Sequence, residues 1–352
     1  MMTKRPDDGS AHVRRKRYSG RNPQAFHDKY KELNPEQYPA EVQKILGTGK
    51  TPAGMHVPIM VAEVLACLRP APGEVAVDCT LGGGGHARLI LERLRPGGRL
   101  IGLDLDPVEL PRTEARLRSD GYGPDVFTAR QANFAGVAQV LGSEGVPAAD
   151  IVLVDLGVSS MQLDNPDRGF SYKGVGPLDM RMNPTRGEPA SAFLARVDEA
   201  ALVSVLREHA DEPHAEVIAS LLKAQPLTTT HATERTIRTG LSKAMPAMSS
   251  ADIKISIRRT FQALRIAVND EFSVLDAFLR ALPLVLSPSG RAAIMTFHSG
   301  EDRRVKKAFQ AGFRAGIYSN VATEVIRSSM EETRANRRAS SAKLRWAVRS
   351  KS

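Results

Sequence analysis

Apolar residues follow two different spacings in this chain, and the two spacings alternate along its first half. Short continuous apolar runs alternate with segments in which apolar residues recur every three or four positions. After a helical pattern at 57–68, the predicted strands are 74–78, 99–104, 125–130 and 150–155, and the predicted helices between them are 86–95, 107–118 and 134–141. Continuous apolar strands separated by helices are typical of a parallel sheet covered on both faces, so we predict an α/β fold.

The alternation stops after the fourth predicted strand. A loop rich in Gly, Pro, Asp and Arg is predicted at 156–188, and helices without a strand are predicted over 190–282. Strand patterns return at 290–297, 321–327 and 343–349, with a helix at 301–312. The predicted domains are a basic, flexible N-terminal extension (1–50), an α/β domain (51–164 and 286–352) and an inserted helical domain (165–285).

Charge is distributed unevenly over the 352 residues. The formal net charge is +10, and Lys and Arg outnumber Asp and Glu by 11 to 6 in residues 1–50 and by 13 to 5 in residues 301–352. A basic excess at both ends suits a polyanion such as RNA. The alternative is that the charged ends only keep the protein in solution, and charge alone does not decide between the two.

Cysteine content and hydropathy favour the cytoplasm. Cys67 and Cys79 are the only two cysteines, which excludes a disulfide framework and a C-x-x-C zinc pair and fits a reducing compartment. No apolar run reaches the roughly 18 residues that span a membrane, and we expect no signal peptide because the N-terminal residues lack an apolar core. Asp7 and Asp8 disfavour an organellar transit peptide, since such peptides are poor in acids.

The most informative motif is the glycine turn that follows the first predicted strand. It reads Asp78-Cys79-Thr80-Leu81-Gly82-Gly83-Gly84-Gly85-His86 and leads into a predicted helix. Four glycines let a ligand approach the backbone, and the start of the helix presents free N–H groups. Such a turn suits a nucleotide-like cofactor, although glycine turns also form for purely structural reasons.

Two cofactors fit this turn. The pattern G-x-G-x-x-A at 82–87 matches the dinucleotide fingerprint, and Asp104 ends the second predicted strand, where it can accept bonds from ribose hydroxyls of NAD or of S-adenosylmethionine. Asp78 favours S-adenosylmethionine, because a carboxylate before the turn would repel a pyrophosphate but suits a cationic amino-acid end. Asp155, at the end of the fourth predicted strand, favours it too, since methyltransferases place a substrate-facing loop there.

His86 has three conceivable roles: a base, a metal ligand or a contact to the cofactor and its loop. No second His, Cys or acid lies near it at metal-ligand spacing. We therefore predict a cofactor or loop contact, and no bound metal.

Several ordered motifs beyond the turn resemble a known family. They are DLGVSSMQLD at 155–164, RGFS at 168–171, GPLDMRM at 176–182, RTFQALRI at 259–266, FHS at 297–299, EDR at 301–303 and SSAKLR at 340–345. From about residue 56 to 349 the chain resembles the bacterial 16S ribosomal RNA cytosine-N4 methyltransferases, the ribosomal RNA small subunit methyltransferase H family. The resemblance implies a Rossmann-like, class I S-adenosylmethionine-dependent methyltransferase sheet with an inserted helical domain that recognises the substrate.

The resemblance also implies the chemistry and the residues of the site. A methyl group would pass from S-adenosylmethionine to the exocyclic N4 amine of one cytosine in small-subunit RNA. The family's cofactor contacts fall on Gly84, Gly85, His86, Asp104, Phe134, Asp155 and Gln162. Phe134 would pack on the adenine, Asp104 would hold the ribose, and Asp155 and Gln162 would lie near the amino-acid end and the transferred methyl group.

The cytosine amine is a weak nucleophile, and the target base must leave its stack to reach a pocket. Asp155, or the backbone of the loop after it, is the candidate acceptor of an N4–H bond. Candidates for stacking on the base or lying beside it, with core packing as the alternative, are Phe170, Tyr172, Phe297 and His298. Candidates for phosphate contacts are Arg168, Arg181, Arg258, Arg259 and Arg265. For the last three, a solvated helix face is the alternative.

Some positions depart from the family pattern. Residues 1–50 lie outside it, Gly300 stands where the family motif has Leu, Arg337 and Ser340 differ from the usual terminal motif, and the stretch from 303 to 336 is short. Two other functions remain open at this point: an NAD-dependent oxidoreductase, supported by the formal fingerprint, and a methyltransferase that acts on DNA or another RNA. A non-catalytic RNA-binding protein is disfavoured by the intact acids at 104 and 155.

Overall fold

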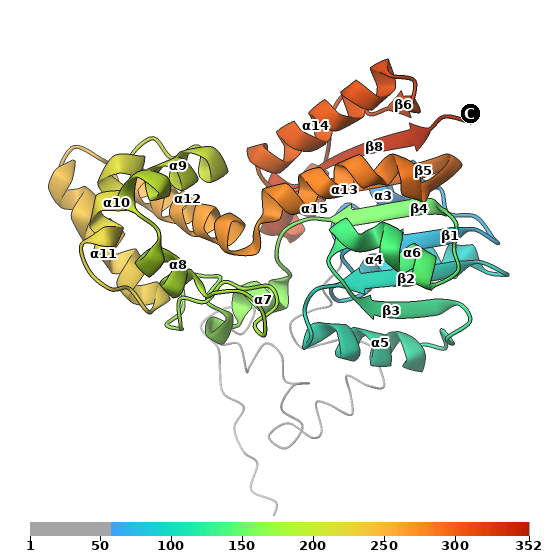
Figure 1. Ribbon diagram of the computed structural model, residues 1–352, viewed down its shortest axis with the longest axis horizontal. Helices are drawn as coiled ribbons and strands as arrows, with labels where there is room; N and C mark the ends of the chain where they lie inside the picture. Colours follow the sequence, from blue (N-terminus) through green and yellow to red (C-terminus); the bar gives the residue numbers. More distant parts are fainter. Residues whose placement is uncertain (1–57, 352) are drawn as a thin grey trace, which may run out of the picture. The chain divides into compact units, whose positions relative to one another are not determined.

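A mixed sheet of eight strands runs through residues 58–351, the part of the chain that the computed structural model describes (Figure 1). The strands are β1 Val75–Asp78, β2 Arg99–Asp104, β3 Phe127–Gln131, β4 Ala149–Asp155, β5 Leu286–Thr296, β6 Tyr318–Val321, β7 Ile326–Arg327 and β8 Lys343–Arg349. Their order is β3-β2-β1-β4-β5-β8-β6, with β7 paired to β8. The first five strands are parallel, so their carboxyl ends share one edge, and the order reverses direction at β1. The N-terminal extension predicted at 1–50 lies outside the described residues.

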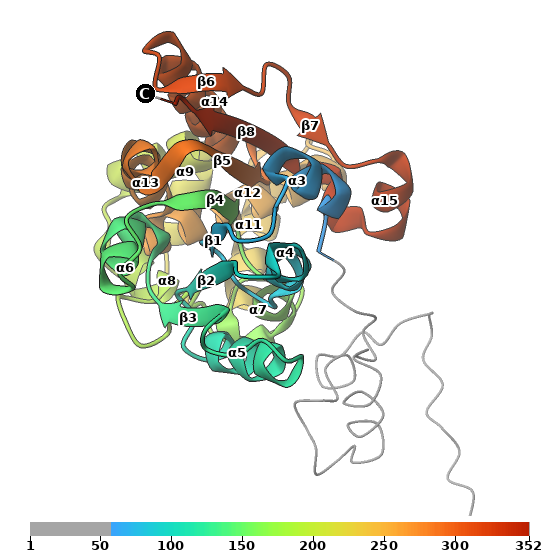
Figure 2. The ribbon, with the colours of Figure 1, turned by 90° about the vertical axis from the view of Figure 1, so that its right-hand side faces the viewer.

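Helices cover both faces of the sheet, as the alternating pattern predicts. The helices packed around the sheet are α3 Val61–Leu68, α4 Gly85–Leu94, α5 Glu109–Ser119, the 3-10 turn η2 Phe134–Gly136, α6 Val137–Ser143, α13 Glu271–Val285 and α14 Ser299–Arg314. Successive residues of a strand point to opposite faces. Val77 and Val152 therefore join the apolar cluster under α6, α13 and α14, whereas Ala76 and Ile151 join the cluster under α3, α4 and α5. Figure 2 shows α6 and α13 on one side of the sheet and α3 and α4 on the other.

A helical bundle is inserted in the chain between β4 and β5, which pair directly with each other in the sheet (Figure 1). Its helices are α8 Ala190–Arg196, α9 Glu199–Ala210, α10 Ala215–Lys223, α11 Thr230–Ala244 and α12 Ser250–Asn269. They enclose an apolar cluster of their own, to which Leu206, Ile237 and Leu264 belong. The buried face of α13 packs under the sheet instead. The backbone turns at Asp270, which has the left-handed φ of 50°, and we propose this turn as the end of the inserted domain.

The connection from β4 to the bundle is more ordered than the predicted loop at 156–188. It contains α7 Ser160–Asp164 and the 3-10 turn η3 Pro166–Arg168. Ser159 and Gln162 form a capping box at the start of α7, in which each side chain bonds the other residue's backbone N–H. A five-residue helix is too short to show a helical period, so the loop prediction was wrong here.

The C-terminal strands also differ from the prediction in position. A strand was predicted near 321–327, but β6 ends at Val321 and only the two-residue β7 follows within that range. The remaining C-terminal elements are α15 Met330–Ala335 and the 3-10 turn η4 Arg337–Ser341. The long β8 was predicted at its observed place, and it pairs antiparallel with β5.

Candidate active site

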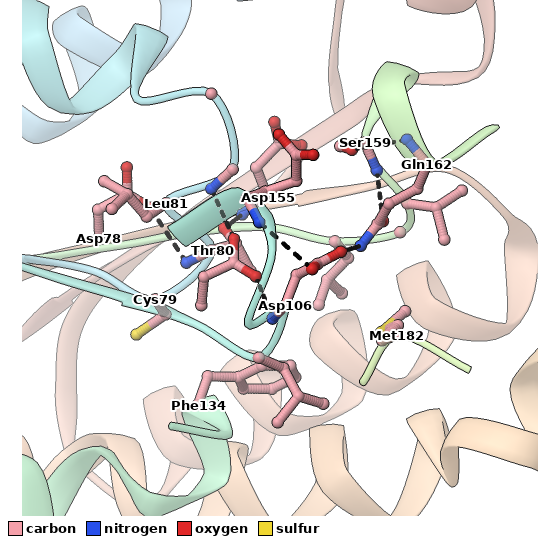
Figure 3. Close-up of a pocket in the computed structure, with 18 of the residues that line it drawn as sticks. Asp78, Cys79, Thr80, Leu81, Asp106, Phe134, Asp155, Ser159, Gln162 and Met182 are labelled. Atoms are coloured by element: carbon pink, nitrogen blue, oxygen red, sulfur yellow. Dashed lines mark hydrogen bonds between the residues drawn. The ribbon is translucent and has the colours of Figure 1, made fainter. Parts of the chain in front are cut away.

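A cavity of about 300 Å³ lies at the carboxyl edge of the parallel strands, where the strand order reverses (Figure 3). The glycine turn after β1 and the loops after β2, β3, β4 and β5 line it, and the turn between α12 and α13 closes one side. Ligand sites of open α/β sheets occur at this crevice. Among the predicted cofactor residues, Gly85, His86, Asp104, Phe134, Asp155 and Gln162 all line the cavity.

The glycine turn needs its glycines for conformation and for space. Gly82 and Gly84 have φ values of 46° and 69°, in the left-handed region that other residues avoid. A Cβ on Gly84 would lie 2.8 Å from Cγ2 of Thr113 on α5, so the turn rests directly on that helix. Thr113 Oγ1 also donates to the carbonyl of Gly82 at 2.6 Å. Gly84 therefore shapes the turn from behind and does not itself line the cavity.

Asp104 anchors the glycine turn to the loop after β2. Its Oδ2 accepts from the N–H of Gly82 at 2.7 Å, and its Oδ1 accepts from the N–H of Asp106 at 2.9 Å. Burial raises the pKa of Asp104, while these backbone bonds oppose the rise. Each carboxylate oxygen can accept a second bond, so Asp104 keeps the capacity to bind ribose hydroxyls.

Two carboxylates end the neighbouring strands β1 and β4: Asp78, which is buried, and Asp155, which is half-buried. Oδ1 of Asp78 accepts from the N–H of Thr80 at 3.1 Å, and Thr80 Oγ1 accepts from the N–H of Asp155 at 2.6 Å. Oδ1 of Asp155 is buried and has no hydrogen-bond partner among the described residues. Burial raises the pKa of each carboxyl to about 7, and the charges of Asp78 and Glu301 add to the rise at Asp155.

His86 lies in the first turn of α4 and is buried. Burial lowers the pKa of its imidazole to about 4, so the ring is neutral near pH 7. Its Nε2 has no hydrogen-bond partner among residues 58–351. Two buried polar atoms beside one cavity, on His86 and Asp155, are the kind of unsatisfied group that a polar ligand completes.

Phe134 forms part of the apolar wall of the cavity. It begins η2 just after β3, and its ring meets Phe278 of α13 edge to face, with centroids 5.4 Å apart. Leu275 of the same helix also lines the cavity. The wall suits the flat face of an adenine ring, which is the role that the family resemblance implies for Phe134.

Gln162 is held by the protein through both ends of its amide. Its Oε1 accepts from the N–H of Ser159 at 3.0 Å, and its Nε2 donates to Oδ2 of Asp106 at 2.8 Å (Figure 3). Asp106 lines the cavity, yet the sequence reasoning missed it. The available signal was its place two residues after Asp104, at the carboxyl end of β2.

The loop after β5 supplies Phe297, His298 and Glu301. Oε2 of Glu301 accepts from the N–H of Phe297 at 2.8 Å, and Nε2 of His298 lies 3.1 Å from Oε1 of Glu301. Burial by itself raises the pKa of Glu301, but His298 and Arg265 outweigh it and the pKa is lowered. Phe297 lines the cavity beside Gly157, where an added Cβ would lie 3.6 Å from its ring. His298 instead caps the start of α14.

Within the described part of the chain, one group of side chains has metal-ligand character: Glu271, His298 and Glu301, whose ligand atoms all lie within 4.8 Å of one another. The group already has partners. Arg265 donates two bonds of 2.8 Å to the two oxygens of Glu271, and His298 contacts Glu301. The absence of a metal stays a prediction.

Three of the arginines predicted to contact phosphate form ion pairs within the protein. Arg168 pairs with Asp106, Arg181 with Asp179, and Arg265 with Glu271. Arg259 is half-buried on α12, where its charge contributes to lowering the pKa of Asp211. Arg258 is exposed on the same helix.

Two of the aromatic residues predicted to stack on the target base follow α7 in the chain, and both pack into the inserted domain. Phe170 is 6% exposed and belongs to the apolar cluster of the bundle. Tyr172 meets Phe261 edge to face with centroids 5.4 Å apart. Neither residue lines the cavity, whereas Phe297 does, so Phe297 is the one stacking candidate that lies at the site.

The departure from the family pattern at position 300 has a packing reason. A Cβ on Gly300 would lie 2.6 Å from Cζ of Phe272. The guanidinium carbon of Arg304 lies over the same ring, 3.7 Å from its centroid. In the C-terminal motif, Arg345 donates to Asp302 at 2.6 Å and thereby ties β8 to α14. Asn336 and Arg338 line the cavity, and Arg338 bonds Asp164 of α7 at 3.0 Å.

Comparison with known proteins decides the family. Residues 53–350 match the MraW methylase family. The chain belongs to this family. It is 48% identical over 342 residues to ribosomal RNA small subunit methyltransferase H 2 of Alkaliphilus metalliredigens, which covers 96% of this chain and 97% of that protein. It is 45% identical over 360 residues to ribosomal RNA small subunit methyltransferase H 1 of Lachnoclostridium phytofermentans, with 99% and 97% covered. The family resemblance inferred from the motifs is confirmed.

Relatives differ in whether they share the N-terminal region. The family match begins at residue 53, and ribosomal RNA small subunit methyltransferase H of Anaeromyxobacter sp. strain K, at 42% identity, covers 82% of this chain. The Lachnoclostridium relative covers 99%, so its alignment includes most of the extension. Among solved structures, an rRNA methylase from Streptococcus thermophilus matches at a TM-score of 0.38 and 10% identity, over 83% of this chain and 95% of that one.

The residues around the cavity fit S-adenosylmethionine. Asp78 and Asp155 are acids whose ionised forms a cationic amino-acid end would stabilise, and Asp104 offers free acceptor capacity for ribose hydroxyls. Phe134 supplies the apolar wall. The unsatisfied atoms on Asp155 and His86 are groups that such a ligand would engage.

Proposed function

We propose that this protein transfers a methyl group from S-adenosylmethionine to the exocyclic N4 amine of a cytosine in small-subunit ribosomal RNA. One observation supports this most strongly: Asp155, whose Oδ1 is buried without a partner among the described residues, stands beside Asp78 at the edge of the sheet where the strand order reverses. Membership of a methylase family supports methyl transfer as the reaction. Relatives named as small-subunit ribosomal RNA methyltransferases support the substrate.

The arrangement of charge disfavours the dinucleotide alternative. A pyrophosphate bound at the glycine turn would face Asp78 and Asp155, two acids in a buried setting where like charges repel strongly. The positively charged sulfonium and ammonium groups of S-adenosylmethionine would instead be attracted to these two acids. The fingerprint at 82–87 therefore indicates an adenosyl cofactor rather than NAD.

S-adenosylmethionine, when bound, supplies a methyl group that is already activated by a positively charged sulfur. The residues of this chain then have to position the target amine and exclude water. Phe297 offers an aromatic face for the unstacked base, and Met182, from the segment between α7 and α8, also lines the cavity. The glycine turn, which Asp104 anchors, and the apolar wall at Phe134 shape the part of the site proposed for the adenosyl group.

Asp155 is the proposed acceptor of the N4–H bond. Cytosine N4 has its lone pair delocalised into the ring, so an acceptor that draws on its hydrogen makes the nitrogen a better nucleophile. The pKa of Asp155, raised by burial to about 7, lets its carboxyl receive a proton near neutral pH after transfer. Because Oδ1 has no partner among the described residues, the Asp155 carboxylate keeps acceptor capacity for this bond.

Two finer points belong to the proposal. Arg259 remains a candidate for a phosphate contact, while Arg168, Arg181 and Arg265 form ion pairs within the protein.

No helix among residues 58–351 has the length and apolar character to cross a membrane. We assign the reaction to the cytoplasm, because bacterial ribosomal RNA is found there.

Mass analysis of nucleosides tests the function directly. Small ribosomal subunits that lack the modification are incubated with the protein and S-adenosylmethionine, and their RNA is digested and analysed. The expected product is N4-methylcytidine, formed by the wild type and strongly reduced with Asp155→Asn. If the protein binds the cofactor but forms no N4-methylcytidine, or methylates only DNA or another RNA, the proposal is wrong.

A further inference from the structure

The carboxylate of Asp106 joins the cofactor side of the site to its substrate side. It is 1% exposed and lies two residues after Asp104, at the carboxyl end of β2. Oδ1 accepts from the N–H of Val108 at 2.9 Å, which ties it to the loop before α5. Oδ2 accepts from two side chains of a distant segment, Gln162 at 2.8 Å and Arg168 at 2.7 Å.

The bond to Gln162 continues into the loop that carries the proposed acceptor. Nε2 of Gln162 donates to Asp106, and its Oε1 accepts from the N–H of Ser159 (Figure 3). Ser159 ends the loop that begins at Asp155. An amide has one donor end and one acceptor end, and both are used here, so only one orientation of Gln162 satisfies Asp106 and Ser159 together.

Arg168 links Asp106 to the segment that leads into the inserted domain. The second terminal nitrogen of Arg168, which does not bond Asp106, donates to the carbonyls of Arg181 at 3.1 Å and Met182 at 2.8 Å. The N–H of Met182 donates in turn to Oδ1 of Asn269 on α12, at 2.7 Å. Met182 and Asn269 both line the cavity. The Arg168 side chain is 13% exposed, so this ion pair is shielded from water and from salt.

We propose that Asp106 is a positioning residue that holds the loop 155–159 and the segment 180–182 in register with the cofactor loop after β2. The proposal rests on the proposed function for its consequence: the register sets where the target amine meets the methyl group. A displacement of about 1 Å at such a site costs about 100-fold in rate. Asp106 has this effect through other residues and is not itself expected to touch the reacting atoms.

Exchanging the donor and the acceptor provides the test. In Asp106→Asn, the Asn oxygen keeps the bond from Val108, and its NH2 group faces the donors of Gln162 and Arg168. In the double variant Asp106→Asn with Gln162→Glu, the Asn NH2 donates to the new carboxylate, which still accepts from Ser159 and places a negative charge beside Arg168. The single variant should lower kcat about 100-fold, and the double variant should recover at least about tenfold.

Two readouts and a control variant separate positioning from cofactor binding and from the general loss of an ion pair. Calorimetry should show that S-adenosylmethionine affinity changes by less than about threefold in Asp106→Asn, because Asp104 and the glycine turn are retained. Hydrogen exchange of the cofactor-bound protein without RNA should show faster exchange of the Ser159 and Met182 amides, and slower exchange again in the double variant. The matched control is Glu74→Gln, which breaks a similar ion pair with Arg291 (2.7 Å, 13% and 21% exposed) before β1, and it should keep kcat.

Each result bears on the proposal separately from the function. A normal kcat in Asp106→Asn, a loss of cofactor affinity equal to the loss of rate, or no recovery in the double variant would overturn it. If Asp106→Asn does not fold, Arg168→Lys takes its place, since it keeps the charge but loses the bonds to the carbonyls of Arg181 and Met182. An unchanged kcat in that variant then contradicts the proposal. A wild type that methylates no RNA contradicts the proposed function, while the exchange data still test the role of Asp106.

Discussion

Two of the carboxylates that line the cavity, Asp155 after β4 and Asp106 after β2, have opposite surroundings. Asp155 has a buried oxygen without a partner among the described residues, and burial beside Asp78 and Glu301 raises its pKa to about 7. Burial acts on Asp106 too, but its bonds from Gln162, Arg168 and Val108 outweigh it and lower its pKa. The difference indicates that Asp106 serves the protein's own architecture, whereas Asp155 is available to a ligand.

The largest effect is expected at Asp155. In Asp155→Asn the side chain keeps its size but no longer accepts a proton, so kcat for RNA methylation should fall about 100-fold or more. Single-turnover methyl transfer measures this. Asp150→Asn is the control, because Asp150 lies near the start of the same strand, where it accepts from Val75 and Ser287, and it should leave the rate within about twofold. Equal rates for Asp155→Asn and the wild type would contradict the assignment.

The glycine turn should show the next effect, on cofactor affinity. In Gly84→Ala a Cβ would lie 2.8 Å from Thr113 at a φ of 69°, so the turn must shift and affinity for S-adenosylmethionine should weaken about tenfold. Calorimetry measures the affinity. Gly142→Ala in α6, where nothing lies within 4 Å of the added Cβ, should bind as the wild type does. A wild-type affinity in Gly84→Ala would show that the turn tolerates a side chain.

The protonation of Asp155 should appear in the stability of the cofactor-free protein. Its folded carboxyl holds a proton up to about pH 7, whereas an unfolded Asp releases it near 3.9. The folded state therefore binds more protons between about pH 4 and 7, and stability falls as pH rises through that window. Asp155→Asn removes its share of the fall, on the order of 2 kcal/mol between pH 5 and 7.5 in urea unfolding. An identical fall in the variant would mean that Asp155 ionises normally.

The smallest effect is expected at the surface of α12. If Arg259 contacts a phosphate, Arg259→Ala should reduce the slope of log K for RNA against log salt by about one, with folding stability unchanged. Arg196→Ala removes an exposed arginine of α8 that pairs with Glu188, and it should leave the slope as it is. Binding measured from 50 to 300 mM salt decides between the two, and an unchanged slope for Arg259→Ala removes it from the interface.

The sequence predicts the sheet and the strand-end acids of the site well, because both follow from local patterns. Continuous apolar runs mark β1, β2, β4 and β5, and the acids at 78, 104 and 155 follow directly as the last residues of three of these strands. The short α7 was missed because it depends on one capping box rather than on a helical period.

Long-range pairings are the part that the sequence could not supply. The partners of Asp106 lie far away in the sequence: Gln162 is 56 positions further along the chain and Arg168 is 62 positions further. Nothing in the local sequence distinguishes Arg168, which is held by this pairing, from an arginine that binds phosphate. The same holds for Arg265, because its pairing with Glu271 leaves no mark in the local sequence. Phe170 and Tyr172 lie in a glycine-rich stretch, yet they pack against the apolar cluster of the bundle. The residues that form this cluster are distant in the sequence, so the packing is not visible in the local pattern.

The contrast between Asp155 and Asp106 can be measured directly. Carbon-13 NMR of carboxyl-labelled aspartates in the cofactor-free protein follows each group through pH, and the resonances are assigned by their loss in Asp155→Asn, Asp106→Asn and Asp78→Asn. We predict that Asp155 titrates near pH 7 and that Asp106 stays ionised down to below its ordinary pKa. Titration of Asp155 near pH 4, or of Asp106 near pH 7, would contradict the account.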